Sequence, residues 1–222
     1  MTKIIPNNPL PPPKSHLIFD FDGTLIDSFA CLVTVFNELA LTHHFRQIKP
    51  EEITMLKNTD SKTLMRLYQI PIYKIPIIIY QAAQQMRNVL LTLQPFAGMP
   101  QTISKLHEAG YRLSIVSSNS EQNVKTWLEH HHLMHFFHHI QHAPYYYGKS
   151  KTLKQVLKQT QHTKEKTCYI GDETRDIEAA KQTGIDCMSV TWGFHSETLL
   201  MQYQPQYLAY HPADILTAFL GG

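Results

Sequence analysis

Charged residues are scarce in this chain, and neither sign dominates. Aspartate, glutamate, lysine and arginine make up 17% of the 222 residues, against about 25% in an average soluble domain. The formal net charge is only +2, so the composition predicts no strongly basic face of the kind that binds nucleic acid. Isoleucine, leucine, phenylalanine and tyrosine recur along the whole chain, which excludes general disorder. We therefore expect a folded protein that does not bind nucleic acid; the composition indicates no oligomeric state.

Cysteine is also rare, and long apolar runs are missing. Cys31, Cys168 and Cys187 are odd in number and widely spaced, which excludes a disulfide framework and predicts reduced, buried thiols in a cytoplasmic protein. Residues 1–14 are interrupted by prolines and lack a continuous apolar segment, so they predict neither a signal peptide nor a membrane span. We expect an extended N-terminal arm there. The longest apolar run elsewhere, residues 75–80, is too short to cross a bilayer.

Helical and strand patterns alternate over most of the chain. Short apolar runs predict strands at residues 16–20, 112–117, 167–171 and 186–191, and helical spacing predicts helices at 99–109, 121–130, 150–160 and 176–183. This alternation is typical of an α/β fold with a doubly wound, Rossmann-like parallel sheet. Residues 28–95 show only helical patterns. We expect a core of residues 15–27 and 96–222 with an all-helical domain, residues 28–95, inserted after the first strand.

Polar residues follow several of the predicted strands at the point where each strand ends. In open parallel sheets, ligands bind beyond the carboxyl ends of the strands. The residues that the sequence places at that edge are carboxylates, hydroxyls and one lysine at a helix start: Asp20, Asp22, Ser117, Ser118, Lys149, Asp172 and Asp176. Carboxylates this close together repel one another unless a cation neutralises them. The pattern predicts a magnesium ion, which shares its ligands between a few carboxylates, phosphate and water.

A phosphate group fits the same edge of the sheet. The Lys149 ammonium and the Ser117 hydroxyl can hold anionic oxygens, together with backbone N–H groups of the turns. The Asp20 carboxylate can attack phosphorus and form an aspartyl phosphate. Asp22 can protonate the leaving oxygen and then activate water. The residues therefore predict phosphate-ester chemistry.

Four segments together resemble the conserved motifs of the haloacid dehalogenase-like hydrolases. Residues 20–28 (DFDGTLIDS) are similar to the first motif and residues 115–119 (IVSSN) to the second. Gly148-Lys149 followed by Leu153 resembles the third, and residues 171–176 (GDETRD) resemble the fourth. The segments occur in the family's order and span about residues 15–195. The helical insert is similar to the small cap of the phosphoglycolate phosphatase-like branch.

The resemblance implies a role for each matched residue. Asp20 would be the nucleophile and a metal ligand, Asp22 the acid and base with its backbone carbonyl on Mg²⁺, and Asp172 the acidic metal ligand. Asp176 would orient metal-bound water or Lys149, and Thr24 would help to position the Asp22 carboxyl. The remaining role is phosphate binding, shared by Ser117, Ser118, Lys149, Gly23 and Thr24.

These roles predict a cytoplasmic, Mg²⁺-dependent phosphatase that acts on a small phosphorylated metabolite through an aspartyl-phosphate intermediate. Phosphoglycolate as the substrate is an analogy with the branch that the insert resembles. Two alternatives stay open. A phosphomutase of the same fold would return the phosphoryl group to a sugar, and a non-catalytic regulatory protein would bind phosphate without turning it over.

Several residues have a second interpretation. Lys151 is a rival to Lys149, and Ser117 or Ser118 could simply cap the helix that follows. Seven of the 14 histidines lie between residues 130 and 142; we interpret them as a polar surface in preference to a metal site. The insert offers five polar residues that could contact the leaving group, each of which could equally be an ordinary solvated side chain: Arg46, Lys49, Lys57, Asn58 and Arg66.

Overall fold

The computed structural model describes residues 3–4, 14–144 and 148–221, except for the side chains of Lys3, Ile4 and Lys62. Seven strands form one sheet in the order β1-β7-β6-β5-β2-β3-β4. All neighbouring pairs are parallel except β1 and β7. The strands are β1 (Lys3–Ile4), β2 (His16–Phe19), β3 (Arg112–Ser117), β4 (Phe137–His142), β5 (Thr167–Gly171), β6 (Asp186–Val190) and β7 (Tyr207–Ala209).

The central strands are continuous apolar runs because both of their faces are covered. Strand β2 is buried along its whole length and pairs with β3 on one side and β5 on the other. Its residues alternate between the two layers of the core: Leu17 and Phe19 pack in one apolar cluster, and Ile18 packs in the other. Burial on both faces removes the polar alternation that marks a one-sided sheet.

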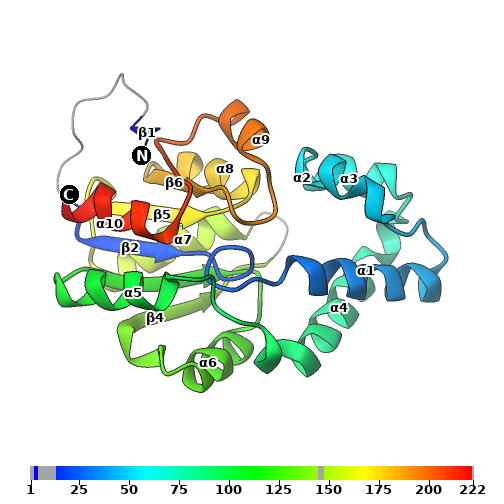
Figure 1. Cartoon of the computed structure of the whole chain (residues 1–222), viewed down its shortest axis with the longest axis horizontal. Helices are drawn as coiled ribbons and strands as arrows, with labels where there is room; N and C mark the ends of the chain where they lie inside the picture. The colour runs from blue at the N-terminus through cyan, green and yellow to red at the C-terminus, as the bar shows by residue number, and fades with distance from the viewer. Residues whose placement is uncertain (1–2, 5–13, 145–147, 222) are drawn as a thin grey trace.

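Helices cover both faces of the sheet (Figure 1). One face packs against α5 (Met99–Glu108), α6 (Glu121–His130) and α10 (Pro212–Leu220). The other packs against α7 (Lys149–Thr160), α8 (Thr174–Thr183) and α9 (Glu197–Gln202). A short 3-10 helix, η4 (Met134–Phe136), precedes β4. The fold is therefore the expected Rossmann-like α/β sandwich.

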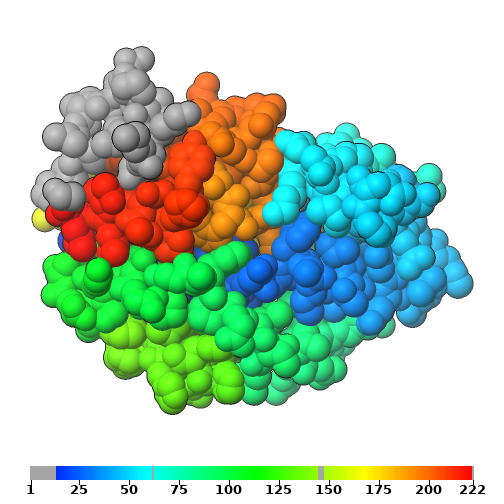
Figure 2. Space-filling model, in the orientation of Figure 1, coloured from blue at the N-terminus to red at the C-terminus, as the bar shows by residue number. Residues whose placement is uncertain are grey.

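An all-helical segment is inserted between β2 and β3 and projects beyond the strand ends (Figure 1). It contains α1 (Phe29–His43), η1 (Pro50–Glu52), α2 (Ile53–Lys57), α3 (Ser61–Leu67), η2 (Ile72–Lys74), α4 (Ile75–Val89) and η3 (Leu90–Thr92). The chain enters and leaves it along two adjacent segments: the Asp27 N–H donates to the Gln94 carbonyl, and the Phe96 N–H donates to the Leu25 carbonyl. In the space-filling view, the α2–α3 part lies against the segment around α9 (Figure 2).

The insert has two small apolar clusters. One joins α1 and α4 around Val35, Leu39 and Met86, and the other joins α2 and α3 around Leu56 and Tyr68. Both clusters are smaller than the two apolar clusters of the core, so fewer buried apolar side chains hold the insert together. No helix of the described residues is both long and apolar enough to cross a bilayer.

The predicted elements of the core match the structure within two residues at most boundaries. Strands β3 and β5 begin and end where the sequence predicts. The sequence did not predict β4, or β7, α9 and α10 at the C-terminal end. Most of the predicted N-terminal arm lies outside the described residues, and residues 3–4 form the edge strand β1. All three cysteines are free, with Cys168 and Cys187 buried and Cys31 half-buried.

Candidate active site

A tight turn after β2 presents two carboxylates at the carboxyl edge of the sheet. The Phe21 carbonyl accepts from the N–H groups of Thr24, Leu25 and Ile26, and the Gly23 N–H donates to the Ile26 carbonyl. This turn needs the left-handed conformation that Gly23 adopts (φ 75°). A Cβ at Gly23 would also lie 2.2 Å from an oxygen of Asp172. Glycine at this position therefore lets the β2 turn approach the carboxylate that follows β5.

Three buried carboxylates meet beyond the ends of β2 and β5. Asp20, Asp172 and Asp176 each offer an oxygen, and these oxygens lie within 4.8 Å of one another. Asp20 is 2% exposed, and the other two carboxylates are fully buried. Asp20 follows β2, Asp172 follows β5 and Asp176 lies in the first turn of α8. The sheet topology thus brings together acids that are far apart in the sequence.

Lys149 is the cation of this cluster. Its Nζ lies 2.7 Å from Oδ2 of Asp20 and 2.5 Å from Oδ1 of Asp176. Burial by itself would lower the pKa of Lys149, but the carboxylates of Asp176 and Asp20 outweigh it and hold the pKa above its ordinary value. The rival Lys151 is exposed to solvent. Of the two lysines, the structure brings Lys149 to the acidic cluster.

Burial and the repulsion between neighbouring carboxylates make the charged form of these acids unfavourable. The pKa of Asp172 is raised well above its ordinary value, first by burial and then by Glu173, Asp176 and Asp20. Asp172 receives only neutral donors, the Thr24 hydroxyl at 2.8 Å and the Phe194 N–H at 2.8 Å. Burial also raises the pKa of Asp20, while Lys149 opposes the rise. These oxygens fit a hard divalent cation, which would neutralise the repulsion.

The acids that lie together differ in part from the metal-ligand set expected from the sequence. The described side chains that cluster are Asp20, Asp172 and Asp176, whereas the sequence-based set has Asp22 in place of Asp176. Asp22 was expected to offer its backbone carbonyl, so its carboxylate is not required in the cluster. Asp176 bonds to Lys149, which is one of the two positioning roles expected of it, and its other oxygen accepts from the Glu173 N–H at 3.0 Å.

The Asp22 carboxylate is not part of the cluster of Asp20, Asp172 and Asp176. Its Oδ2 accepts from Nδ2 of Asn119, which follows β3, at 3.0 Å. Burial raises the pKa of Asp22 to about 6, and the hydrogen bond from Asn119 limits the rise. A carboxyl with a pKa near neutrality can both give and take a proton. Thr24 does not take the role expected for it, because its hydroxyl donates to Asp172 and not to Asp22.

The two serines that follow β3 have different environments. The Ser117 hydroxyl is buried and accepts from the Asn119 N–H at 3.1 Å. The Ser118 hydroxyl is half-buried and accepts from Nη2 of Arg175 at 3.3 Å. Neither caps α6, since the hydroxyl of Ser120 accepts from the Asn123 N–H at the start of that helix. Both hydroxyls remain candidates for phosphate binding.

Two polar contacts at the site were not assigned from the sequence. One is the bond from Asn119 to Asp22. The other is the pair of Glu173 and Arg175, in which Nη2 of Arg175 lies 2.5 Å from Oε1 of Glu173. Asn119, Glu173 and Arg175 all lie inside the segments that resemble family motifs. The sequence therefore showed where these residues are, but not which side chains they contact.

The insert contacts the core next to these residues. The Ser61 hydroxyl donates to Oε2 of Glu173 at 3.4 Å. Nζ of Lys57 donates to the Gly193 carbonyl at 2.9 Å and lies 4.7 Å from the centre of the Phe29 ring. The Ser196 hydroxyl donates to Oδ1 of Asn58 at 2.5 Å. Of the five insert candidates, Lys57 and Asn58 therefore lie at the boundary with the core; Arg46 pairs with Glu52 of the insert, and Lys49 and Arg66 are exposed.

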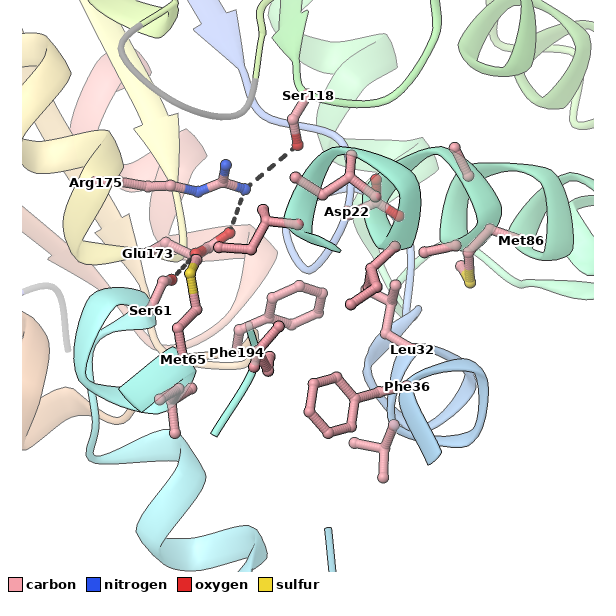
Figure 3. A pocket seen from close by; sticks show the side chains of 18 of the residues that line it. Asp22, Leu32, Phe36, Ser61, Met65, Met86, Ser118, Glu173, Arg175 and Phe194 are labelled. Carbon is pink, nitrogen blue, oxygen red and sulfur yellow. Dashed lines mark hydrogen bonds and ion pairs between the residues drawn. The ribbon is translucent and has the colours of Figure 1, made fainter. Parts of the chain in front are cut away.

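A cavity of about 670 Å³ opens between the insert and the catalytic edge of the sheet. Asp22, Ser118 and Asn119 line one end of it, together with Glu173 and Arg175. Figure 3 shows Asp22, Ser118, Glu173 and Arg175 along one side of the hollow, with Leu32, Phe36, Met65 and Met86 around the rest. The candidate acid and base Asp22 therefore faces a chamber that an ester's leaving group could enter.

The seven histidines of residues 130–142, all of which the structure describes, are exposed or half-buried. The Asn119 carbonyl lies 3.0 Å from Nδ1 of His142. Among the described residues, the group of three or more metal-binding side chains that lie together is the aspartate cluster. The interpretation of the histidines as a polar surface stays a prediction.

Comparison with known proteins places the chain in a family. A model of the haloacid dehalogenase-like hydrolases matches residues 17–190. A phosphoglycolate phosphatase from Synechococcus elongatus is 32% identical over 202 residues, which cover 91% of this chain and 95% of the relative. The pyrophosphatase PpaX from Bacillus mycoides is 22% identical over 90% of this chain and 94% of its own length.

Solved structures show the same architecture. A haloacid dehalogenase-like hydrolase from Streptococcus pneumoniae superimposes with a TM-score of 0.79 at 23% identity, covering 93% of this chain and 98% of the other. The sequence similarity and the shared fold agree with the four motif-like segments and their meeting at one edge of the sheet. The chain therefore belongs to the haloacid dehalogenase-like hydrolase family and is an enzyme of that family.

Proposed function

We propose that this enzyme is a Mg²⁺-dependent phosphatase that hydrolyses a small phosphomonoester through a phosphoaspartate on Asp20. The observation that carries the proposal is the arrangement of Asp20 and Asp22 in one turn. Asp20 lies among the acids with Lys149 at 2.7 Å, and Asp22 faces the cavity. Two carboxylates with separate environments suit two separate roles.

The reaction follows from these two positions. A carboxylate oxygen of Asp20 forms a bond to phosphorus as the bond from phosphorus to the ester oxygen breaks. Asp22 gives its proton to the departing alcohol oxygen. Asp22 then removes a proton from water, which attacks the phosphorus of the phosphoaspartate. Inorganic phosphate leaves, and Asp20 is restored as a carboxylate.

The neighbouring residues would hold the phosphoryl oxygens and the cation. We propose that Lys149, Ser117 and Ser118 bind the phosphoryl group together with the turn at Gly23 and Thr24. Asp20, Asp172 and the Asp22 carbonyl would hold Mg²⁺; Asp176 is positioned to hold Lys149 and is a further donor. A bound Mg²⁺ supplies charge neutralisation between the carboxylates and the entering phosphate. Asn119 keeps the Asp22 carboxyl oriented toward the cavity.

Residues 28–95 are proposed as the cap domain that closes the site, with residues 15–27 and 96–222 as the core. A cap over the site would exclude water and contact the leaving group. The relatives are named for different substrates, a phosphoglycolate phosphatase and a pyrophosphatase, so their names support a phosphatase more than any single substrate. The free cysteines support a cytoplasmic location.

The test compares Asp20→Asn with Asp27→Asn in the release of phosphate from p-nitrophenyl phosphate. Asp27 is exposed in the same segment and serves as the control. We expect Asp20→Asn to lower kcat by roughly a thousandfold or more and Asp27→Asn to keep it within about twofold. Chelation with EDTA should abolish turnover by the wild type, and added Mg²⁺ should restore it. Unchanged activity of Asp20→Asn would contradict the proposal.

A further inference from the structure

We propose that the alcohol half of the substrate is apolar, an alkyl or aryl group that occupies the cavity between the insert and the core. This inference rests on the proposed function and names its substrate class. It follows from the chemistry of the cavity wall, from the pairing of the nearby cations and from the position of Asp22 at the cavity's end.

The wall that the insert contributes is almost entirely apolar. Its members are side chains of α1 to α4 and their connections, among them Leu32, Phe36, Leu64, Tyr68 and Met86, with Ser61 at the boundary. The Tyr68 hydroxyl is engaged by Oε2 of Glu52 at 3.3 Å. Among the described side chains, the insert therefore presents hydrocarbon to whatever enters the cavity.

Among the described lysine and arginine side chains, Arg175 is the one that lines the cavity, and it already has partners. Arg175 contacts Glu173 and Ser118. Nζ of Lys57 donates to the Gly193 carbonyl and lies over the Phe29 ring. A leaving group that carries a carboxylate, such as glycolate, would need a positive partner to replace the water it loses. An apolar leaving group needs none.

The hollow is too large to be a packing defect of the insert. Protein interiors are close-packed and leave few voids larger than a water molecule, whereas this cavity measures about 670 Å³ and falls in the range of small-molecule sites. Members of both apolar clusters of the insert line it, among them Ile78 and Met86 of one and Leu56 and Tyr68 of the other. An apolar ligand in this position would contact both clusters and bury the wall.

The cavity leads to the reacting atoms. Asp22 and Asn119 line it at the core end, where the alcohol oxygen must sit to receive the proton from Asp22. Figure 3 shows Asp22 at the edge of the hollow, with Leu32, Phe36 and Phe194 beyond it. An ester whose phosphate lies at the acidic cluster therefore directs its alcohol chain along the apolar wall.

The test measures kcat/KM for a series of n-alkyl phosphates from methyl to octyl, with phosphoglycolate as the polar comparison. We expect kcat/KM to rise roughly two- to fourfold for each added methylene until the cavity is filled. Octyl phosphate should be hydrolysed better than phosphoglycolate. A flat series, or a preference for phosphoglycolate, would overturn the inference while leaving the proposed function in place. If the enzyme hydrolyses none of these esters and does not hydrolyse p-nitrophenyl phosphate either, the proposed function itself is overturned.

Matched variants locate the effect in the cavity. Leu64 and Leu67 both lie on α3, but only Leu64 lines the cavity. Leu64→Gln should lower kcat/KM for octyl phosphate at least tenfold and leave methyl phosphate within about twofold; Leu67→Gln should change neither. Ala82→Phe, which fills the cavity from α4, should shorten the longest chain that is accepted. Equal effects of Leu64→Gln and Leu67→Gln, with no shortening by Ala82→Phe, would refute the assignment.

Discussion

Replacing Lys149 with methionine should destabilise the fold in the absence of a divalent cation. The Lys149 side chain is buried and lies 2.7 Å from Asp20 and 2.5 Å from Asp176. Methionine keeps much of the side-chain volume but removes the charge, so the two carboxylates stay buried beside Asp172 without their cation. Breaking a buried ion pair by removing one partner costs about 3–5 kcal/mol, a large fraction of the roughly 5–15 kcal/mol by which domains are stable.

The assay is thermal unfolding in EDTA, followed by circular dichroism. For a chain of this size, each kcal/mol shifts Tm by about 2–4 °C, so Lys149→Met should unfold about 6–20 °C below the wild type. Lys151→Met is the control because Lys151 is exposed two residues further along the same helix, and a substitution there should cost at most about 0.5 kcal/mol. Equal Tm values for the two variants would refute the view that Lys149 is the cation that holds the acidic cluster together.

Three further predictions follow from single contacts. Gly23→Ala should cost more in urea unfolding than Gly110→Ala, because both glycines have positive φ but only a Cβ at Gly23 would meet Asp172, at 2.2 Å; equal costs would mean that backbone strain alone matters. Asn119→Ala should lower kcat roughly 10- to 100-fold with little change in KM, since it removes the hydrogen bond to the Asp22 carboxylate; unchanged kcat would remove Asn119 from the proposal. Burial first, and then the charge of His162, lowers the pKa of His16 from 6.5 to about 3. Neutral His16 therefore makes its full contribution to the free energy of unfolding above pH 6.5. This contribution is lost as the pH falls from 6.5 toward 3, and the loss is about 2 kcal/mol at pH 5. Urea unfolding at pH 7 and pH 5 should show a loss that His16→Gln lacks, and equal losses would contradict the assignment.

The sequence predicted the core well because buried parallel strands are continuous apolar runs. Residues 112–117 and 167–171 have this pattern and became β3 and β5. Strand β7 was missed because three residues are too few for a pattern to emerge. The insert was predicted as helical, but the cavity between the insert and the core was not. Helical spacing identifies the apolar face of a helix and does not say whether that face meets another helix or an open space.

The convergence of Asp20, Asp172 and Asp176 followed from topology, since parallel strands end at one edge of the sheet. The partners of individual groups did not follow. Thr24 was expected beside Asp22, yet its hydroxyl donates to Asp172. Such contacts depend on how far neighbouring strands and their turns are offset along the sheet, and a single sequence does not encode that offset visibly.

The central claim is that Asp20 carries the phosphoryl group during turnover. Asp22→Asn is the variant for this measurement, because without a base to activate water the phosphoaspartate should accumulate. The enzyme would be mixed with p-nitrophenyl phosphate and Mg²⁺, quenched in acid and digested, and the phosphorylated peptide identified by mass spectrometry. The account predicts a phosphoryl group on Asp20, in an amount that approaches one per active site. Phosphorylation of another residue, or turnover by the wild type with no phosphoaspartate in either protein, would contradict it.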